Sequence, residues 1–223
     1  MRSEIQVPQF EIIHRAGCVV RFDDHFLGRP VLEELSVRLR GAGDPILAQD
    51  GRSRRHSDGT YRFAEVPDGT YALEVSSRSK TWTAWTAPPS LTLPLAKPLE
   101  PLVCSLWPTP RSPRVPGVAM VRARLVGVGI ARLKVEMAGV PLTGPTVWTD
   151  RYNRSDSDGE LVFLLPERLE RTSTGDLVVQ VRVEDGSRAV VGGTVLAGRT
   201  ATPFSGDRFT LVPGGETRAM INV

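Results

Sequence analysis

Three histidines are the residues of this chain that could act as general bases near neutral pH: His14, His25 and His56. A nucleophilic hydrolase would need one of them beside an activated serine, but the chain has no Gly-x-Ser-x-Gly motif to present such a serine. His56 precedes Ser57, yet neighbours in sequence do not place an imidazole on a hydroxyl. The zinc motifs His-Glu-x-x-His and Cys-x-x-Cys are also missing from the sequence. We therefore expect no enzyme activity, no catalytic residue and no cofactor.

One oxygen-rich loop is a candidate metal site. Asp150, Asn153, Asp156 and Asp158, followed by Glu160, offer the carboxylate and amide oxygens that suit a hard cation such as Ca²⁺. Asp156 and Asp158 would be the central ligands. The loop lacks the regular ligand spacing and the late bidentate glutamate of a helix-loop-helix calcium site. Asx turns at strand ends explain the same residues, so we expect no bound metal.

Two of the four tryptophans, Trp82 and Trp85, are candidate ligand-binding residues. In a regular strand they have opposite parity, so one faces the core and the other faces solvent. An exposed indole is a platform for stacking on a sugar ring and also a frequent hot spot in protein interfaces. The pair therefore keeps carbohydrate binding open as an alternative function.

The charge of the chain argues against nucleic acid as a partner. The formal net charge is +3 and the arginines are spread along the predicted strands, whereas a nucleic-acid-binding protein normally concentrates its charge on one face. Arg52, Arg54, Arg55 and His56 form one small basic loop. We interpret it as a solvated loop tip, with contact to phosphate or to an acidic partner as the alternative.

The elements that must position these residues are predicted to be strands. Val, Leu and Thr are plentiful, and no stretch keeps a 3.6-residue apolar period over three turns. The segment from Ser57 to Val75 has two Asp-Gly turns, at Asp58-Gly59 and Asp68-Gly69, and each is followed by alternating apolar residues. This pattern predicts a hairpin of two half-buried strands. Ser157-Asp158-Gly159 repeats the turn 100 residues later, before a second alternating run, Leu161 to Leu165.

The repeat and a proline-rich stretch predict two domains. Four prolines between Pro108 and Pro116 are typical of a stiff extended spacer. We expect an all-β chain of two tandem Greek-key β-sandwiches. Its predicted parts are an N-terminal arm at 1–16, domain 1 at 17–107, a linker at 108–117 and domain 2 at 118–223. Phe10 and Ile12 in the arm, and Ile221 and Val223 in the last strand, are the residues expected to contact partners.

The first domain resembles the transthyretin-like, carboxypeptidase regulatory-like and Cna B-type family of small sandwiches. The resemblance rests on Gly17-Cys18-Val19-Val20-Arg21-Phe22, on Gly28-Arg29-Pro30-Val31 with Leu35-Ser36-Val37-Arg38-Leu39, and on the segment from Asp58 to Val75. It implies a Greek-key sandwich that serves as an adhesive, spacer or assembly module, usually without an active site. Pilin members carry a lysine to asparagine crosslink, but Arg21 takes the place of that lysine and residues 102–106 contain no asparagine, so no crosslink is expected. The second domain shares only the Asp158-Gly159 turn, and its membership is an analogy.

The predicted compartment is the cytoplasm. Arg2, Glu4 and Pro8 interrupt the start of the chain where a secretory signal has its apolar core, and about 20 consecutive apolar residues occur nowhere, so no membrane insertion is expected. Cys18 and Cys104 are too few for a disulfide scaffold. We favour two reduced buried thiols, although a bridge between the first and last strands of domain 1 stays open.

These observations favour a non-catalytic structural or interaction protein with protein partners, joined by pairing of edge strands. The most specific expectation is a cap, adaptor or decoration subunit of a phage-tail-like contractile injection particle, made in the cytoplasm and released as part of that particle. A carbohydrate-binding or surface-adhesion module is the alternative.

Overall fold

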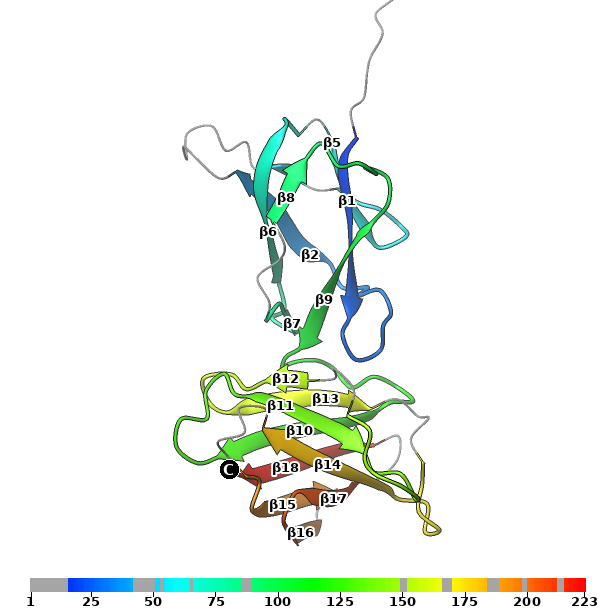
Figure 1. Ribbon diagram of the computed structural model, residues 1–223, viewed down its shortest axis with the longest axis vertical. Helices are drawn as coiled ribbons and strands as arrows, with labels where there is room; N and C mark the ends of the chain where they lie inside the picture. The colour runs from blue at the N-terminus through cyan, green and yellow to red at the C-terminus, as the bar shows by residue number, and fades with distance from the viewer. Residues whose placement is uncertain are drawn as a thin grey trace, which may run out of the picture. The chain divides into compact units, whose positions relative to one another are not determined.

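The computed structural model describes most of the chain. All the regular secondary structure of the described residues is β-strand. The all-β prediction is therefore confirmed (Figure 1). Among these residues there is no helix that is long and apolar enough to span a membrane. Phe10 and Ile12 of the predicted arm lie outside them. The described residues are 16–41, 51–52, 54–64, 66–85, 90–148, 152–165, 170–183, 189–197, 200–211 and 215–223.

Contacts divide the chain into two compact units, and the division does not follow the predicted ranges. Unit 1 consists of Met1–Arg21, Val37–Glu74 and Pro88–Val103. Unit 2 consists of Phe22–Ser36, Val75–Ala87 and Cys104–Val223. Two segments from the first half of the sequence thus pack with the second half.

The strands before residue 109 form two sheets, in the orders β4-β5-β1-β9-β7 and β3-β2-β6-β8. Leu35, Val37 and Leu39 are buried while the residues between them are exposed, which is the predicted period of two. The strands are β1 (Ala16–Asp24), β2 (Leu35–Gly41), β3 (Gly51–Arg52), β4 (Arg54–Arg55), β5 (Thr60–Ala64), β6 (Gly69–Ser77), β7 (Trp82–Thr83), β8 (Ser90–Leu93) and β9 (Leu102–Pro108).

The predicted hairpin between Ser57 and Val75 is wrong in its pairing. The turn at Asp58-Gly59 joins β4 to β5, which pair with each other, whereas β5 and β6 belong to different sheets. Tyr61 and Phe63 are buried as expected. The alternating pattern therefore located both strands and their inward residues, but Asp68-Gly69 carries the chain from one sheet to the other.

The repeated turn is confirmed in its geometry. In the first copy His56 N–H donates to Thr60 O and Gly59 N–H donates to His56 O, at 2.8 and 3.0 Å. In the second copy Asp156 N–H donates to Glu160 O and Gly159 N–H donates to Asp156 O, at 2.9 and 3.2 Å. Both turn glycines have φ of 79°, a left-handed conformation that favours glycine. The connections differ, because the first turn joins two paired strands, β4 and β5, whereas the second joins β12 and β13, which belong to different sheets.

The nine strands after residue 118 form a β-sandwich within unit 2. One sheet has the order β13-β10-β18-β15-β16 and the other β12-β11-β14-β17 (Figure 1). Buried residues of both sheets belong to one apolar core. The Greek-key topology stays a prediction. The strands are β10 (Ala119–Val126), β11 (Lys134–Gly139), β12 (Tyr152–Arg154), β13 (Glu160–Leu165), β14 (Leu177–Val183), β15 (Gly192–Ala197), β16 (Thr200–Ser205), β17 (Arg208–Leu211) and β18 (Glu216–Asn222).

The segment between β9 and β10, which the sequence predicts as a linker, belongs to unit 2 and is hydrogen-bonded to other segments of that unit. Ser112 donates its hydroxyl to Thr81 O, and Thr109 N–H donates to the same oxygen at 2.8 Å. The Arg122 guanidinium, on β10, donates to Pro110 O, to Ser112 O at 2.6 Å and to Glu216 Oε1 at 3.0 Å. One arginine thus holds the proline-rich segment against the sheet.

Gly193, on β15, is a position where a side chain has no room. A Cβ atom added there would collide with the carbonyl oxygen of Met220 on β18 and would lie 2.8 Å from the ring of Phe204 on β16. We expect Gly193→Ala to lower the free energy of unfolding by roughly 1–3 kcal/mol, because the neighbouring backbone must shift to admit the methyl group. Urea denaturation measures this effect. Gly41→Ala is the matched control, since its nearest neighbour is Tyr71 at 3.8 Å, and equal losses in the two variants would contradict the prediction.

Candidate functional site

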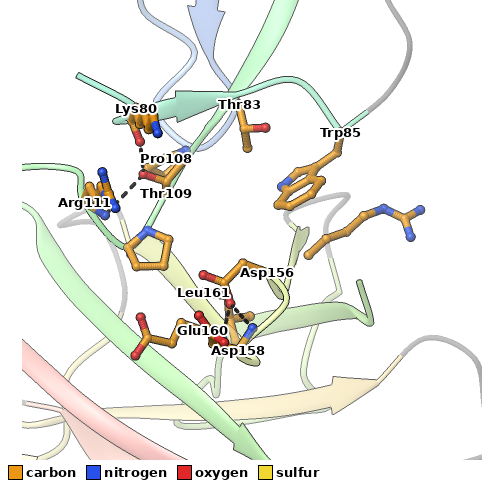
Figure 2. A pocket seen from close by; sticks show the side chains of 12 residues that line it. Lys80, Thr83, Trp85, Pro108, Thr109, Arg111, Asp156, Asp158, Glu160 and Leu161 are labelled. Atoms are coloured by element: carbon orange, nitrogen blue, oxygen red, sulfur yellow. Dashed lines mark hydrogen bonds between the residues drawn. The ribbon is translucent and has the colours of Figure 1, made fainter. Parts of the chain in front are cut away.

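A pocket of about 400 Å³ opens in unit 2 beside the second copy of the repeated turn. Three pieces of chain line it: the segment around β7, the end of β9 with the residues that follow it, and the turn between β12 and β13 (Figure 2). Trp85, one of the predicted binding residues, is part of the lining. The lining residues are Lys80, Thr83, Trp85, Pro108, Thr109, Pro110, Arg111, Arg154, Asp156, Asp158, Glu160 and Leu161.

Asn153, on β12, is fully buried and holds Trp85 in place. Its Oδ1 accepts the indole N–H of Trp85 at 2.6 Å and the backbone N–H of Arg154 at 2.8 Å. Its Nδ2 donates to Val162 O at 2.6 Å and to Pro108 O at 3.1 Å. Both amide hydrogens and two acceptor positions are thus in use. Asn153 was predicted as one of several loop oxygens for a cation, but its amide is committed to β9, β13 and the indole.

The acidic wall of the pocket comes from an Asx turn. Asp156 Oδ1 accepts the N–H groups of Asp158 at 2.9 Å and of Glu160 at 2.8 Å, as the Asx-turn interpretation expected. The carboxylates of Asp158 and Glu160 have no hydrogen-bond or ion-pair partner among the described residues. Within the same part of the chain, no three His, Cys, Asp or Glu residues lie where they could share a metal ion. Asp150 lies outside the described residues.

Another part of the pocket lining carries positive charge. Thr109 donates its hydroxyl to Lys80 O at 2.6 Å and accepts the backbone N–H of Arg111 at 3.2 Å, so one hydroxyl joins the two chain segments that bear these cations (Figure 2). The ammonium of Lys80 and the guanidinium of Arg111 have no partner among the described side chains. Arg154 donates to Arg132 O at 3.4 Å.

The structure brings only one of the two predicted tryptophans into this pocket. Trp82 lies on β7, opposite Pro108 on β9, and is half-buried. Trp85 lies beyond the end of β7 and packs against the core of unit 2. The alternation of a strand therefore does not decide which of the two indoles faces solvent, because β7 ends at Thr83, before Trp85.

The predicted partner contact at the last strand is wrong for Ile221. β18 pairs in parallel with β10 and antiparallel with β15, so both of its edges are already paired. Ile221 is fully buried in the core. Val223 is half-buried, and its N–H donates to Val126 O at 3.1 Å, which extends the ladder with β10.

Two clusters in unit 2 have no clear signal in the sequence. His25 stacks on Trp107 with ring centroids 4.5 Å apart, and Trp107 donates its indole N–H to Tyr152 O at 2.9 Å. Glu33 accepts the hydroxyls of Ser77, at 2.6 Å, and of Ser79 and Thr81. These contacts join segments more than 40 residues apart in the chain, which local patterns do not report.

The Glu33 cluster favours the charged carboxylate. Partial burial by itself would raise the pKa of Glu33, but the hydroxyls of Ser77, Ser79 and Thr81 outweigh it and lower the pKa below the ordinary value. A folded-state pKa below the unfolded one adds stability that is present above the unfolded pKa and is lost as the pH falls through the folded value. The cluster is thus a structural tie between the loop after β1 and the loop after β6.

Neither cysteine is poised for chemistry. Cys18 and Cys104 are both free thiols, and burial raises the pKa of each to about 11. The thiolate is the reactive form, so at neutral pH nearly all of either residue is the unreactive thiol.

No family model matches the chain, and no curated protein sequence matches it. Among solved structures, it is similar to the Bacillus anthracis TIE protein at 11% identity, over 93% of this chain and 34% of that one, with a TM-score of 0.31. It is similar to a Streptococcal ancillary pilin at 15% identity, over 92% of this chain and 62% of that one, with a TM-score of 0.31. It is also similar to the shaft pilin SpaA from Lactobacillus rhamnosus GG at 10% identity, over 93% of this chain and 97% of that one, with a TM-score of 0.33.

The chain thus spans about a third of the TIE protein and less than two thirds of the ancillary pilin. At these TM-scores and identities the similarities do not define a family or a function. The predicted relation of domain 1 to transthyretin-like and Cna B-type sandwiches stays a prediction.

Removing the amide of Asn153 should destabilise unit 2. We expect Asn153→Leu to cost about 3 kcal/mol or more, because the Trp85 indole and two buried carbonyls lose their partners together. Asn153→Asp keeps Oδ1 but turns a second oxygen toward the carbonyls of Pro108 and Val162. Its destabilisation should grow as the pH rises and the buried carboxyl ionises. Chemical denaturation at pH 5 and pH 8 measures both variants. Asn222→Asp, at an exposed position of β18, is the control, and an Asn153→Asp loss that is independent of pH would contradict the assignment.

Alkylation should report the raised pKa of the two thiols. At pH 8 we expect iodoacetamide to modify the native protein at least about tenfold more slowly than the chain in urea, because the thiolate fraction is small. The native rate should climb steadily as the pH approaches 11. Mass spectrometry of the Cys104→Ser and Cys18→Ser variants assigns each rate. Equal rates at pH 8 in the native and unfolded chains would show that burial does not protect the thiols.

Proposed function

We propose that this chain is a non-catalytic structural protein that binds other proteins through the free edge of β16. The observation that carries the proposal is the position of this strand. β16 is the outermost strand of the five-stranded sheet in unit 2, and five of its six residues are exposed. The outer backbone groups of such a strand are a template for pairing with another chain.

The hydrogen-bond pattern identifies the groups that face outward. All six residues of β16 pair with β15, and just beyond them Gly206 N–H donates to Val191 O at 3.2 Å. Since bonded and non-bonded pairs alternate in an antiparallel ladder, residues 202 and 204 bond to β15 and residues 201, 203 and 205 point away. Pro203 has no N–H, so the outward donors are those of Ala201 and Ser205.

The polar and thiol side chains that could have carried chemistry have structural roles instead, which is consistent with a non-catalytic protein. Asp156 and Asn153 are engaged by backbone groups, and burial keeps the cysteines in the thiol form. These contacts give the groups a structural role. The outer edge of β16, in contrast, pairs with no strand among the described residues.

The more specific form of the proposal is a cap, adaptor or decoration subunit of a phage-tail-like contractile injection particle that is made in the cytoplasm. Its support is the predicted sandwich analogy, and sedimentation of the native protein with a large particle is its test. A surface-adhesion module would use the same edge. In that case the protein would be recovered from the cell surface.

The test of the edge is a proline that removes one outward donor. We expect Ala201→Pro to release the protein from its complex in the source cell lysate, because the substitution removes an N–H that faces the partner while leaving the bonds to β15 intact. Ala201→Val keeps that N–H and should stay in the complex. Gradient sedimentation compares the variants, and thermal melting confirms that both are folded. Wild-type protein that sediments alone, or Ala201→Pro that stays bound, would overturn the proposal.

A further inference from the structure

We propose that the pocket beside Trp85 binds a carbohydrate, with one sugar ring stacked on the indole. Its volume of about 400 Å³ falls in the usual range for small-molecule sites, about 300–1,000 Å³. All the lining residues belong to unit 2, so the pocket is a feature of one compact body. This site goes beyond the strand edge proposed above and does not depend on it.

The indole is fixed before any ligand arrives. The 2.6 Å bond from Trp85 Nε1 to the fully buried Asn153 orients the ring, which points toward the space between Thr83, Pro108 and Asp156 (Figure 2). A rigid aromatic side chain offers contact area at a low cost in conformational entropy, because its rotamer is already set. The two prolines of the lining, Pro108 and Pro110, add apolar surface near it.

Two of the three carboxylates that line the pocket, those of Asp158 and Glu160, are not needed to form the turn that carries them. In the first copy of the turn, Asp58 accepts the N–H and the hydroxyl of Thr60, at 2.9 and 2.6 Å. In the second copy the acceptor is Asp156, which lies two residues before Asp158, the equivalent of Asp58. Its Oδ1 accepts the backbone N–H groups of Asp158 and Glu160. The turn therefore does not use the carboxylate of Asp158, and Glu160 places a second carboxylate where the first copy has Thr60. Both residues line the pocket. The same backbone geometry is reached in both copies, so turn formation does not explain the free charges.

The balance of charge selects the class of ligand. Asp158 and Glu160 are acceptors on one wall, and Lys80 and Arg111 are donors on another. The carboxylates would repel an anion, and the cationic side chains would repel a cation. An apolar ligand would remove water from both sets of charges and form no hydrogen bonds to replace it. A hydroxyl group donates and accepts, so a neutral polyol satisfies both walls. A sugar ring adds an apolar C–H face that suits the indole.

Titration with maltotetraose, chitotetraose and xylotetraose tests this site in the full chain. We expect at least one of the three to bind and to shift the indole N–H resonance of Trp85, among the four tryptophan resonances, in two-dimensional NMR. Trp85→Phe assigns that resonance. Calorimetry should show at least fivefold weaker binding for Glu160→Gln and for Lys80→Gln, because each loses one hydroxyl partner. Neither side chain has a hydrogen-bond or ion-pair partner among the described residues, so both variants should fold.

Asp68→Asn, in the turn before β6, and Trp82→Phe, outside the pocket, are the matched controls and should bind as the wild type does. The site would be overturned if none of the three oligosaccharides binds at 10 mM. It would also be overturned if the shifts fall on Trp82, Trp107 or Trp148, or if the pocket variants bind as tightly as the controls. Tighter binding of diglycine, a zwitterion, would replace the carbohydrate assignment. The Ala201→Pro variant should keep sugar binding, which separates failure of this site from failure of the strand edge.

Discussion

The hydrogen bonds of Asn153 are the interaction on which the rest of unit 2 depends. A single buried amide joins the end of β9, strand β13, the backbone of β12 and the indole of Trp85. Buried polar groups are costly when unpaired and strongly orienting when fully paired, so this arrangement fixes one register among the four pieces of chain. The pocket exists because its walls are attached to these pieces. Arg122 plays the same part for the proline-rich segment, through bonds to Pro110 and Ser112.

The sequence predicted what local patterns determine. Alternating residues such as Leu35, Val37 and Leu39 identified strands and their buried faces, and Asp-Gly at 58–59 and 158–159 identified two turns of the same geometry. Partner choice was not predictable in this way. An alternating apolar pattern indicates which face of a strand is buried but not which strand lies beside it. For this reason β5 and β6, which are consecutive in the chain, were predicted to form a hairpin, although they belong to different sheets. The last strand, β18, was likewise expected to contact partners through Ile221 and Val223, because nothing local shows that it pairs with β10, which lies nearly 100 residues earlier.

The candidate site was predictable only in its residue types. Trp85 and the aspartates around 156–158 were singled out by their chemistry, yet nothing in the sequence places them in one pocket, since the two segments are about 70 residues apart. Polarity also says little about burial. Asn153 looked like a loop oxygen because asparagine is usually exposed, whereas its side chain is a fully bonded part of the core. Lys80 and Arg111 gave no signal, because an isolated cation is ordinary on a protein surface.

The edge of β16 and the pocket beside Trp85 differ in the kind of recognition they allow. Backbone pairing tolerates many sequences, and Pro203 leaves β16 with outward donors only at Ala201 and Ser205, so one pairing event contributes few hydrogen bonds. The exposed residues of the strand are small or polar and add little apolar area. Weak single contacts become effective when several copies of a subunit bind together, since the later contacts form at high local concentration. Such an edge therefore suits a subunit of a repeating assembly better than a protein that binds one partner alone.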